Sequence, residues 1–177
     1  MAMVHNDAGS DRHWLAALER VSDGAALTDR IFGLVSHSQF FAEFTREDVV
    51  QLAAYMQIYR AAPDQTLIGE GDRGDHMLLI IEGAVDIYKD NSRGEQQHMT
   101  SAGPGMTLGE MSMIDGEPRF ASCIAVAPTT VGVLTRDTMG RIIVEQPALG
   151  AKILVRLVTM LSQRLRQTSA KLLQYMS

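Results

Sequence analysis

The chain has 177 residues, enough for one domain with a hydrophobic core, and its 46% apolar and 21% charged residues are ordinary for a globular protein. A formal net charge of −5 and the lack of any Lys/Arg block exclude the broad basic face that a nucleic-acid binder needs. The single cysteine, Cys123, excludes an intrachain disulfide, and with neither a leader peptide nor a membrane-length apolar run we expect a soluble, cytoplasmic protein.

The N-terminal third has helical patterns. Residues 1–13 are polar, and residues 14–35 have helical apolar spacing that "SDGAALTD" interrupts, which predicts two short helices. Thr45 with Asp48 three residues later favours the start of another helix, just after a cluster of phenylalanines at positions 40, 41 and 44. We expect residues 1–37 to form a tail with short helices before a main domain of residues 38–148.

After Pro63 the pattern changes to short, often β-branched segments separated by Gly and Asp. "HMLLIIEGAVDIYKD" is typical of two strands joined at Glu82-Gly83, and "ASCIAVAP" with "TTVGVLT" of another pair. Strands at such regular spacing indicate an antiparallel sandwich or barrel of about eight strands. We therefore expect an α+β fold, with an eight-stranded antiparallel β-barrel flanked by N-terminal helices and a long C-terminal helix.

The C-terminal region is helical again. A short helix follows Arg136 and stops at Pro147, and residues 149–177 form one long helix. Its apolar residues recur in alternating steps of four and three, as in a coiled coil: Leu154, Val158, Leu161, Leu165, Thr168, Leu172 and Tyr175. A second strip of Ile153, Leu157 and Met160 lies beside it. We expect the second strip to pack on the helix's own domain and the first to pair two copies as a homodimer.

The segment "LGEMSMIDGEPRFAS", residues 108–122, has the components of an anion site. Gly109 allows close approach of the backbone, and the following residues can form one helical turn whose first N–H groups lack partners. Arg119 would supply charge and a bidentate contact, while Glu110 could accept hydrogen bonds from sugar hydroxyls. The residue types alone leave a second interpretation open, in which both side chains are solvated turn residues.

This segment resembles the phosphate-binding cassette of the cyclic nucleotide-binding domain family, whose pattern is Gly-Glu followed at this spacing by Pro-Arg-x-Ala-Ser/Thr. A second segment, "EGDRGDHMLLIIEG" at residues 70–83, is similar to the Gly-Asp-x-Gly-Asp turn upstream in the same family. The resemblance extends over residues 38–175 and implies a jelly-roll type of β-barrel. It also implies a regulatory sensor, most consistent with cAMP as ligand, whose C-terminal helix covers the base and pairs protomers.

The resemblance also implies roles for individual residues. Glu110 would bind the ribose 2′-hydroxyl and Arg119 the cyclic phosphate. Gly109, Met111 and Ser112 would provide backbone atoms around the sugar and phosphate. Ala121 would let the chain pack closely behind the phosphate, and Gly71 would form a turn at the rim of the pocket. Base contacts would come from the C-terminal helix, where the polar candidates are Thr159, Ser162 and Tyr175. Pairing of protomers would use Leu154, Val158, Leu161, Leu165 and Leu172.

Phe120 departs from the family pattern, which has a small or hydroxyl-bearing residue at this position. Because Phe has no hydroxyl, nothing favours cGMP. An inward ring would obstruct the ligand, whereas an outward ring would leave the backbone N–H usable. Two alternatives follow: a non-binding member of the fold that acts as a dimeric interaction module, and a binder of another nucleotide such as cyclic di-GMP.

Other chemistry has little support in the sequence. The five histidines lack metal-ligand spacing, and no Gly-x-Ser-x-Gly elbow is present, so we expect no metal site, no cofactor and no enzymatic activity. Because the sequence ends directly after the long helix, we expect no direct DNA binding from this chain. Its output would instead pass to an effector protein whose identity the sequence does not indicate.

Overall fold

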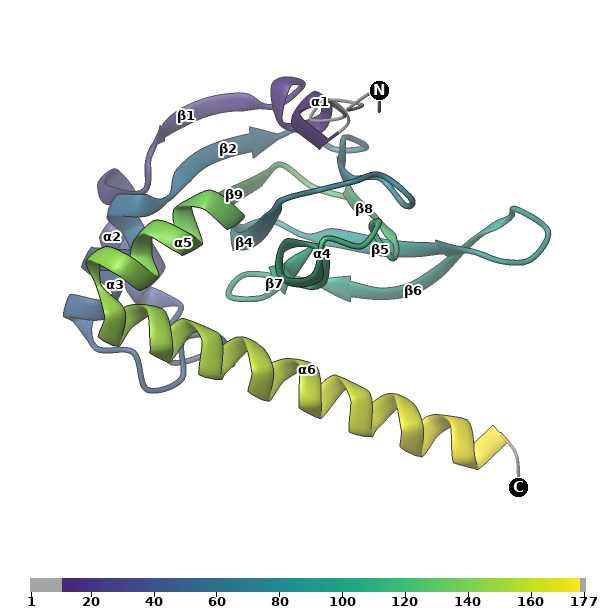
Figure 1. Ribbon diagram of the computed structural model, residues 1–177. Helices are drawn as coiled ribbons and strands as arrows, with labels where there is room; N and C mark the ends of the chain where they lie inside the picture. The colour runs from purple at the N-terminus through teal and green to yellow at the C-terminus, as the bar shows by residue number, and fades with distance from the viewer. Residues whose placement is uncertain (1–10, 176–177) are drawn as a thin grey trace, which may run out of the picture.

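The structure is a computed structural model that describes residues 11–175, so the expected tail over residues 1–10 lies outside it. Two antiparallel sheets form its centre, with short helices at one end and a long helix running along one side (Figure 1). The N-terminal elements are α1 (Asp11–Ala16), β1 (Glu19–Asp23), η1 (Gly24–Leu27), α2 (Thr28–Gly33) and α3 (Arg46–Tyr55). The central elements are β2 (Gln57–Ala61), β3 (Thr66–Ile68), β4 (His76–Glu82), β5 (Val85–Asp90), β6 (Gln96–Ala102), β7 (Thr107–Leu108), α4 (Glu110–Asp115), β8 (Ser122–Ala125) and β9 (Thr129–Thr135). The chain closes with α5 (Arg136–Glu145) and α6 (Pro147–Tyr175).

The α+β class and the antiparallel sheets are confirmed, but the eight-stranded closed barrel is not. Residues 11–175 contain nine strands in two sheets, ordered β1-β2-β9-β4-β7 and β3-β8-β5-β6. Consecutive strands often change sheet, as β4 and β5 do across Gly83 and β8 and β9 do across Pro128. The two strand pairs expected from the sequence, β4 with β5 and β8 with β9, are therefore connections between the sheets rather than hairpins, whereas β5 and β6 do form a hairpin within one sheet.

The ninth strand, β1, lies in a segment that the sequence analysis assigned to helix. Glu19 lies opposite Arg60 and Asp23 opposite Gln57, so β1 extends the first sheet beyond β2. This five-residue segment is too short and too polar to have a clear period, and its pairing with the edge of β2 decides its conformation. The short helices α1 and α2 lie on either side of it.

The start of α3 has the predicted capping box. The Thr45 hydroxyl accepts a hydrogen bond from the Asp48 N–H at 3.2 Å, and the Asp48 carboxylate accepts one from the Thr45 N–H at 2.7 Å. Such reciprocal bonds satisfy two N–H groups that the first helical turn leaves without partners. Just before it, the rings of Phe40, Phe41 and Phe44 pack with centroids 5.0 to 5.7 Å apart inside the core.

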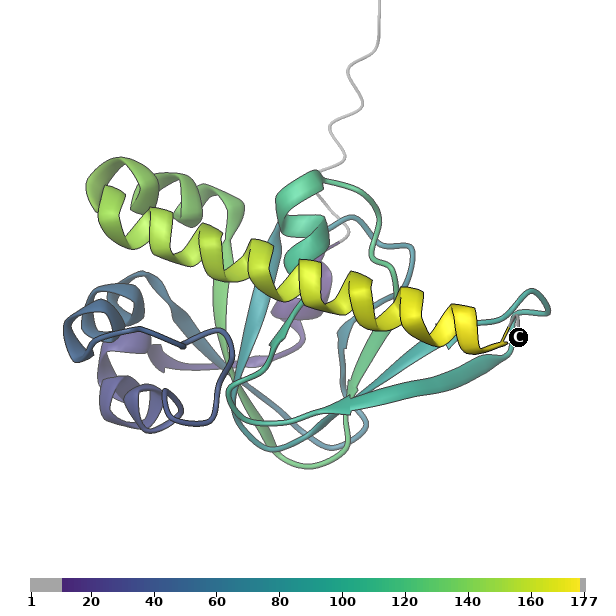
Figure 2. The ribbon, with the colours of Figure 1, turned by 90° about the horizontal axis from the view of Figure 1, so that it is seen from below.

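The two faces of α6 differ as predicted. Ile153, Leu157 and Met160 are buried in the core cluster, whereas the coiled-coil stripe is largely exposed. The helix begins at Pro147, because proline fits the first helical position. Its N-terminal half packs beside α5, and its C-terminal half passes α4 and extends toward the end of the β5–β6 ribbon (Figure 2). Within residues 11–175, no helix is both long and apolar enough to cross a membrane.

Candidate functional site

Gly109 sets the geometry of the cassette. It precedes α4 with φ +79°, a left-handed conformation that favours glycine. A Cβ at this position would lie 2.6 Å from Nη1 of Arg119 and 2.9 Å from Cδ1 of Ile68. The glycine therefore lets the backbone before α4 lie directly against the Arg119 guanidinium.

Arg119 is held by both its side chain and its backbone. The guanidinium is 2% exposed; its Nη1 donates to the Gly109 carbonyl at 2.8 Å and its Nη2 to Nδ1 of His76 at 3.3 Å. The Arg119 N–H donates to the Asp72 carbonyl at 2.7 Å, and the Gly71 N–H donates to the Arg119 carbonyl at 2.9 Å. The upstream Gly-Asp-x-Gly-Asp turn thus pairs directly with the cassette, so the two sequence motifs form one site.

His76 supports this arrangement as a neutral base. The side chain is buried, and burial, together with the Arg119 charge, lowers its pKa to about 3. A neutral imidazole with its lone pair on Nδ1 can accept the hydrogen bond from Arg119. The Asp75 carboxylate 3.9 Å from Nδ1 therefore forms no ion pair with this ring at neutral pH.

Glu110 is the second buried charge of the site, at 1% exposure. Its Oε1 pairs with Nη1 of Arg164 on α6, and Nη2 of Arg164 lies 3.5 Å from the Thr107 carbonyl. The other carboxylate oxygen, Oε2, is buried without a hydrogen-bond partner in the described structure, as is the Thr107 hydroxyl. Burying a carboxylate oxygen without a hydrogen bond costs folding free energy. Oε2 of Glu110 can therefore accept a hydrogen bond from one more donor.

Phe120 points away from this cluster. Its side chain is 56% exposed, and the ammonium of Lys89 lies 4.8 Å from the ring centroid. Lys89 in turn pairs with Glu70, whose pKa is lowered mainly by that hydrogen bond. Of the two orientations open to Phe120, the structure has the outward one.

The other predicted site residues lie around the same loop. Ser112 is buried on α4, Met111 is 46% exposed beside it, Ala121 is partly buried, and Gly71 has φ +81° at the rim turn. On α6, the Thr159 hydroxyl donates to the Val155 carbonyl of its own helix at 2.8 Å, Ser162 is partly buried, and the Tyr175 side chain lies outside the described residues.

The sequence analysis missed His76 and Arg164. His76 opens β4 immediately after the Gly-Asp-x-Gly-Asp turn, which was the available signal for it. Arg164 lies beside the coiled-coil stripe and resembles any other charge on a helix surface. Only the path of α6 past α4 identifies it, because 54 residues separate it from Glu110.

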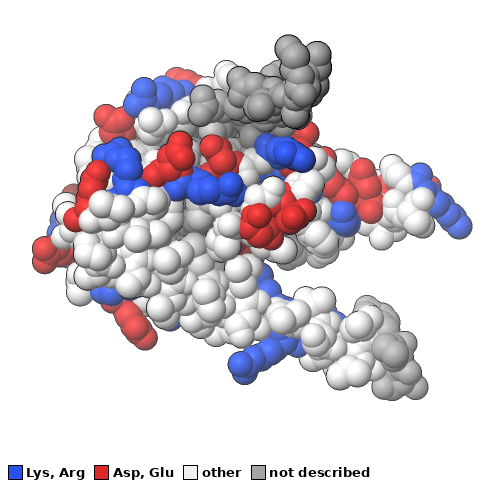
Figure 3. Space-filling view, viewed as in Figure 1, with Lys and Arg blue, Asp and Glu red and all other residues white. Residues whose placement is uncertain are grey.

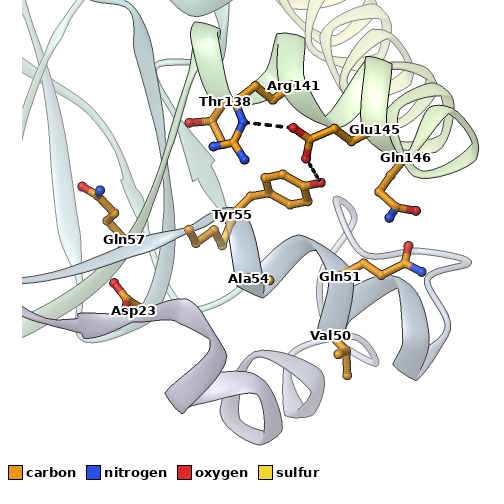
Figure 4. A pocket seen from close by; sticks show the side chains of 11 residues that line it. Asp23, Val50, Gln51, Ala54, Tyr55, Gln57, Thr138, Arg141, Glu145 and Gln146 are labelled. Carbon is orange, nitrogen blue, oxygen red and sulfur yellow. Dashed lines mark hydrogen bonds and ion pairs between the residues drawn. The ribbon is translucent and has the colours of Figure 1, made fainter.

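Two further features are not among the predicted site residues. Cys123 is buried, and burial raises its pKa to about 12, which makes its thiol unreactive at neutral pH. An open hollow of about 680 Å³ lies between α3 and α5, where Glu145 accepts hydrogen bonds from Tyr55 at 2.7 Å and Arg141 at 3.2 Å (Figure 4).

No group of three potential metal ligands occurs in the described residues. On the face shown in Figure 3, basic and acidic side chains are interspersed over the body of the molecule.

Comparison with known proteins agrees with this geometry. Residues 59–146 match the cyclic nucleotide-binding domain family. A crystal structure of a cyclic nucleotide-binding domain from Methylobacillus flagellatus KT is 39% identical, covers 89% of both chains and superposes with a TM-score of 0.80. This chain belongs to the cyclic nucleotide-binding domain family.

Curated relatives of this cyclic nucleotide-binding domain are regulators by name. The cyclic AMP receptor protein of Thermus thermophilus is 27% identical over 135 residues, which is 76% of this chain and 61% of that protein. The cAMP-dependent protein kinase regulatory subunit of Yarrowia lipolytica is 26% identical over 117 residues, which is 66% of this chain and 30% of that protein. The chain thus spans less than two thirds of the length of both relatives.

Proposed function

We propose that this chain is a cAMP sensor that binds the nucleotide between the α4 loop and α6 and signals through α6 to a partner protein. The observation that carries the proposal is a pair of buried, opposite charges: Arg119, which donates to the Gly109 carbonyl, and Glu110, which directly follows Gly109. Arg119 can bind a phosphate, and Glu110 beside it can accept a hydrogen bond from a sugar hydroxyl. A nucleotide has both of these groups. The cAMP-linked names of the relatives support cAMP as the specific ligand.

The phosphate would bind at Arg119. The contacts from Gly109 and His76 hold the guanidinium in one orientation before any ligand arrives, which lowers the cost of ordering it on binding. An anionic phosphate would make charge-assisted bonds to this guanidinium, which are stronger than its bonds to neutral acceptors. The backbone at Gly109, Met111 and Ser112 would line the sugar and phosphate, and the exposed Phe120 ring leaves this space to the ligand.

The ribose would bind at Glu110. A 2′-hydroxyl can donate to Oε2, the oxygen without a hydrogen-bond partner, while Oε1 keeps its bond to Arg164. The ligand would then complete a chain of bonds from the cassette to α6. Bound nucleotide would therefore favour the conformation in which α6 lies against α4.

Signalling follows from this coupling. The site groups are only 1–2% exposed, so α6 or α4 must move outward for ligand to enter. A ligand that binds one α6 position better than the other shifts the population by its differential affinity. The exposed coiled-coil stripe of α6 supports a homodimer through this helix, and a partner protein would read the change in helix position. Binding at the site is the step on which the rest depends.

Calorimetric titration of cAMP, cGMP and cyclic di-GMP into the protein tests the proposal. We expect cAMP to bind at least as tightly as cGMP. The Arg119→Ala variant should bind cAMP roughly thirtyfold to a thousandfold more weakly, because a lost charge-assisted bidentate contact is worth roughly 2–4 kcal/mol. Arg93→Ala, in the exposed β5–β6 turn, is the matched control and should bind normally.

Two other outcomes would replace the proposal. No heat with any nucleotide at high protein concentration would favour the non-binding interaction module, for which the internal pairing of Glu110 with Arg164 is the supporting observation. Tight binding of cyclic di-GMP alone would make the chain a receptor for that larger ligand.

A further inference from the structure

The turn of residues 69–72, between β3 and β4, sets the position of the Arg119 backbone. The Arg119 N–H donates to the Asp72 carbonyl at 2.7 Å, and the Gly71 N–H donates to the Arg119 carbonyl at 2.9 Å. None of these three residues lies in a helix or strand, so no ladder of regular hydrogen bonds holds them. The turn therefore holds Arg119 only as firmly as its other contacts hold the turn.

The N-terminal helix α1 provides such a contact through Trp14. The indole Nε1–H donates to Oδ2 of Asp72 at 2.5 Å, across 58 residues of sequence. A Cβ on Gly69 would lie 3.2 Å from the same indole nitrogen, so the Trp14 ring lies directly against the backbone of the turn. Asp72 thus joins two parts of the molecule, because its carboxylate contacts α1 and its carbonyl contacts Arg119.

Helix α1 is itself docked on the two sheets. Leu18, just after the helix, is buried in a hydrophobic cluster contributed by strands of both sheets, and Leu15 packs against the same cluster. The Ala17 carbonyl accepts a hydrogen bond from the Gln65 side chain at 2.7 Å. Trp14 therefore reaches the turn from a position that the core fixes.

We infer that Trp14 is a positioning residue of the nucleotide site. Its bond to Asp72 holds the turn that fixes the Arg119 backbone, and so keeps the guanidinium where the phosphate would bind. The inference rests on the proposed function for the identity of the ligand, and on the contacts above for the link from α1 to Arg119. Trp14 is assigned no contact with the ligand and acts through the Asp72 carboxylate.

Calorimetry of cAMP binding to Trp14→Phe tests this role, because phenylalanine keeps an aromatic ring but has no N–H to donate. We expect an affinity about fivefold to tenfold weaker than that of the parent protein, since a hydrogen bond to a charged group is lost and Arg119 is held less firmly. Arg20→Ala is the matched control. It removes a bond from the same N-terminal region to a different carboxylate, Asp23, at 2.9 Å and should bind cAMP as the parent does.

A double variant separates an effect through Asp72 from a general loss of stability. Asp72→Ala removes the carboxylate but leaves the backbone carbonyl that accepts from Arg119, so it should weaken cAMP binding as Trp14→Phe does. The double variant should bind no more weakly than the weaker of the two single variants, because both remove one bond. Asp72→Asn should restore most of the affinity, since its amide oxygen can accept from the indole. Parent affinity in Trp14→Phe, or losses that multiply in the double variant, would contradict the inference.

Hydrogen exchange without nucleotide decides the inference separately from the proposed function. The Arg119 and Gly71 amides donate the two bonds between the turn and the cassette, and should exchange about fivefold faster in Trp14→Phe than in Arg20→Ala. Equal exchange of these amides in the two variants would overturn the inference. If the parent protein binds no cAMP, the proposed function is refuted, and the exchange comparison alone decides whether Trp14 holds Arg119.

Discussion

Gly109 combines a left-handed backbone with the closest packing in the cassette, so a single methyl group there has two effects. Gly109→Ala should cost about 1–2 kcal/mol of folding free energy from the positive φ alone, and should also displace the Arg119 guanidinium. Gly94→Ala is the matched control, because Gly94 has φ +75° but no atom within 4 Å of the position that a Cβ would take. Urea unfolding and cAMP calorimetry of both variants separate the effects.

We expect both variants to lose a similar amount of stability from strain, but only Gly109→Ala to lose cAMP binding. Equal cAMP affinity in the two variants would show that close approach at Gly109 does not matter for the site.

His76 predicts a pH dependence of stability. The ordinary pKa of a histidine is 6.5 and that of His76 in the folded protein is about 3, so the unfolded chain binds the extra proton first as the pH falls. The stabilisation is fully present above pH 6.5 and is lost toward pH 3, by up to about 1.4 kcal/mol per pH unit. After burial, the Arg119 charge is the second cause of this shift, and the Asp75 carboxylate lies 3.9 Å from Nδ1 of the ring.

Urea unfolding between about pH 7.5 and about pH 5 measures this slope. His76→Gln, which keeps an acceptor for Arg119 but does not titrate, should be flatter over the same range. An identical slope in the variant would assign the pH dependence to other groups.

Among single residues, the sequence analysis identified those site residues that lie together in one loop. Gly109, Glu110 and Arg119 were predicted because their spacing is itself the motif, and the structure brings them together. The two side chains that contact them, His76 on β4 and Arg164 on α6, come from other elements, and a single charged or polar residue has no period or spacing to reveal its partner.

Among the elements, α6 has two apolar faces with different tasks. Leu157 is fully buried against the core, whereas Leu165 is 69% exposed. Leu157→Glu should therefore unfold the domain or lower its free energy of unfolding by about 3–5 kcal/mol, because the substitution buries a charge without a partner. Leu165→Glu should leave the fold within about 0.5 kcal/mol but dissociate the proposed dimer.

Analytical ultracentrifugation and thermal unfolding of the two variants make this comparison. A parent protein that sediments as a monomer at micromolar concentration, or a dimer that Leu165→Glu does not weaken, would contradict pairing through the stripe.

Element prediction succeeded where the pattern was long or had a specific start. The period of α6 and the capping box at Thr45 are examples, and both were confirmed. It failed where pairing between distant segments decides the structure. β1 depends on β2 for its conformation, and the distribution of strands over two sheets depends on which edges meet, neither of which a local pattern contains.

For the whole molecule, the main proposal is that one ligand site and one long helix are coupled through Glu110 and Arg164. Amide hydrogen exchange with and without saturating cAMP is the sharpest test, because it reads α4 and α6 in the same sample. We predict slower exchange in both helices of the parent protein when cAMP is bound, and slower exchange in α4 alone in Arg164→Gln. Unchanged exchange of α6 in the parent protein at saturating cAMP would contradict this coupling.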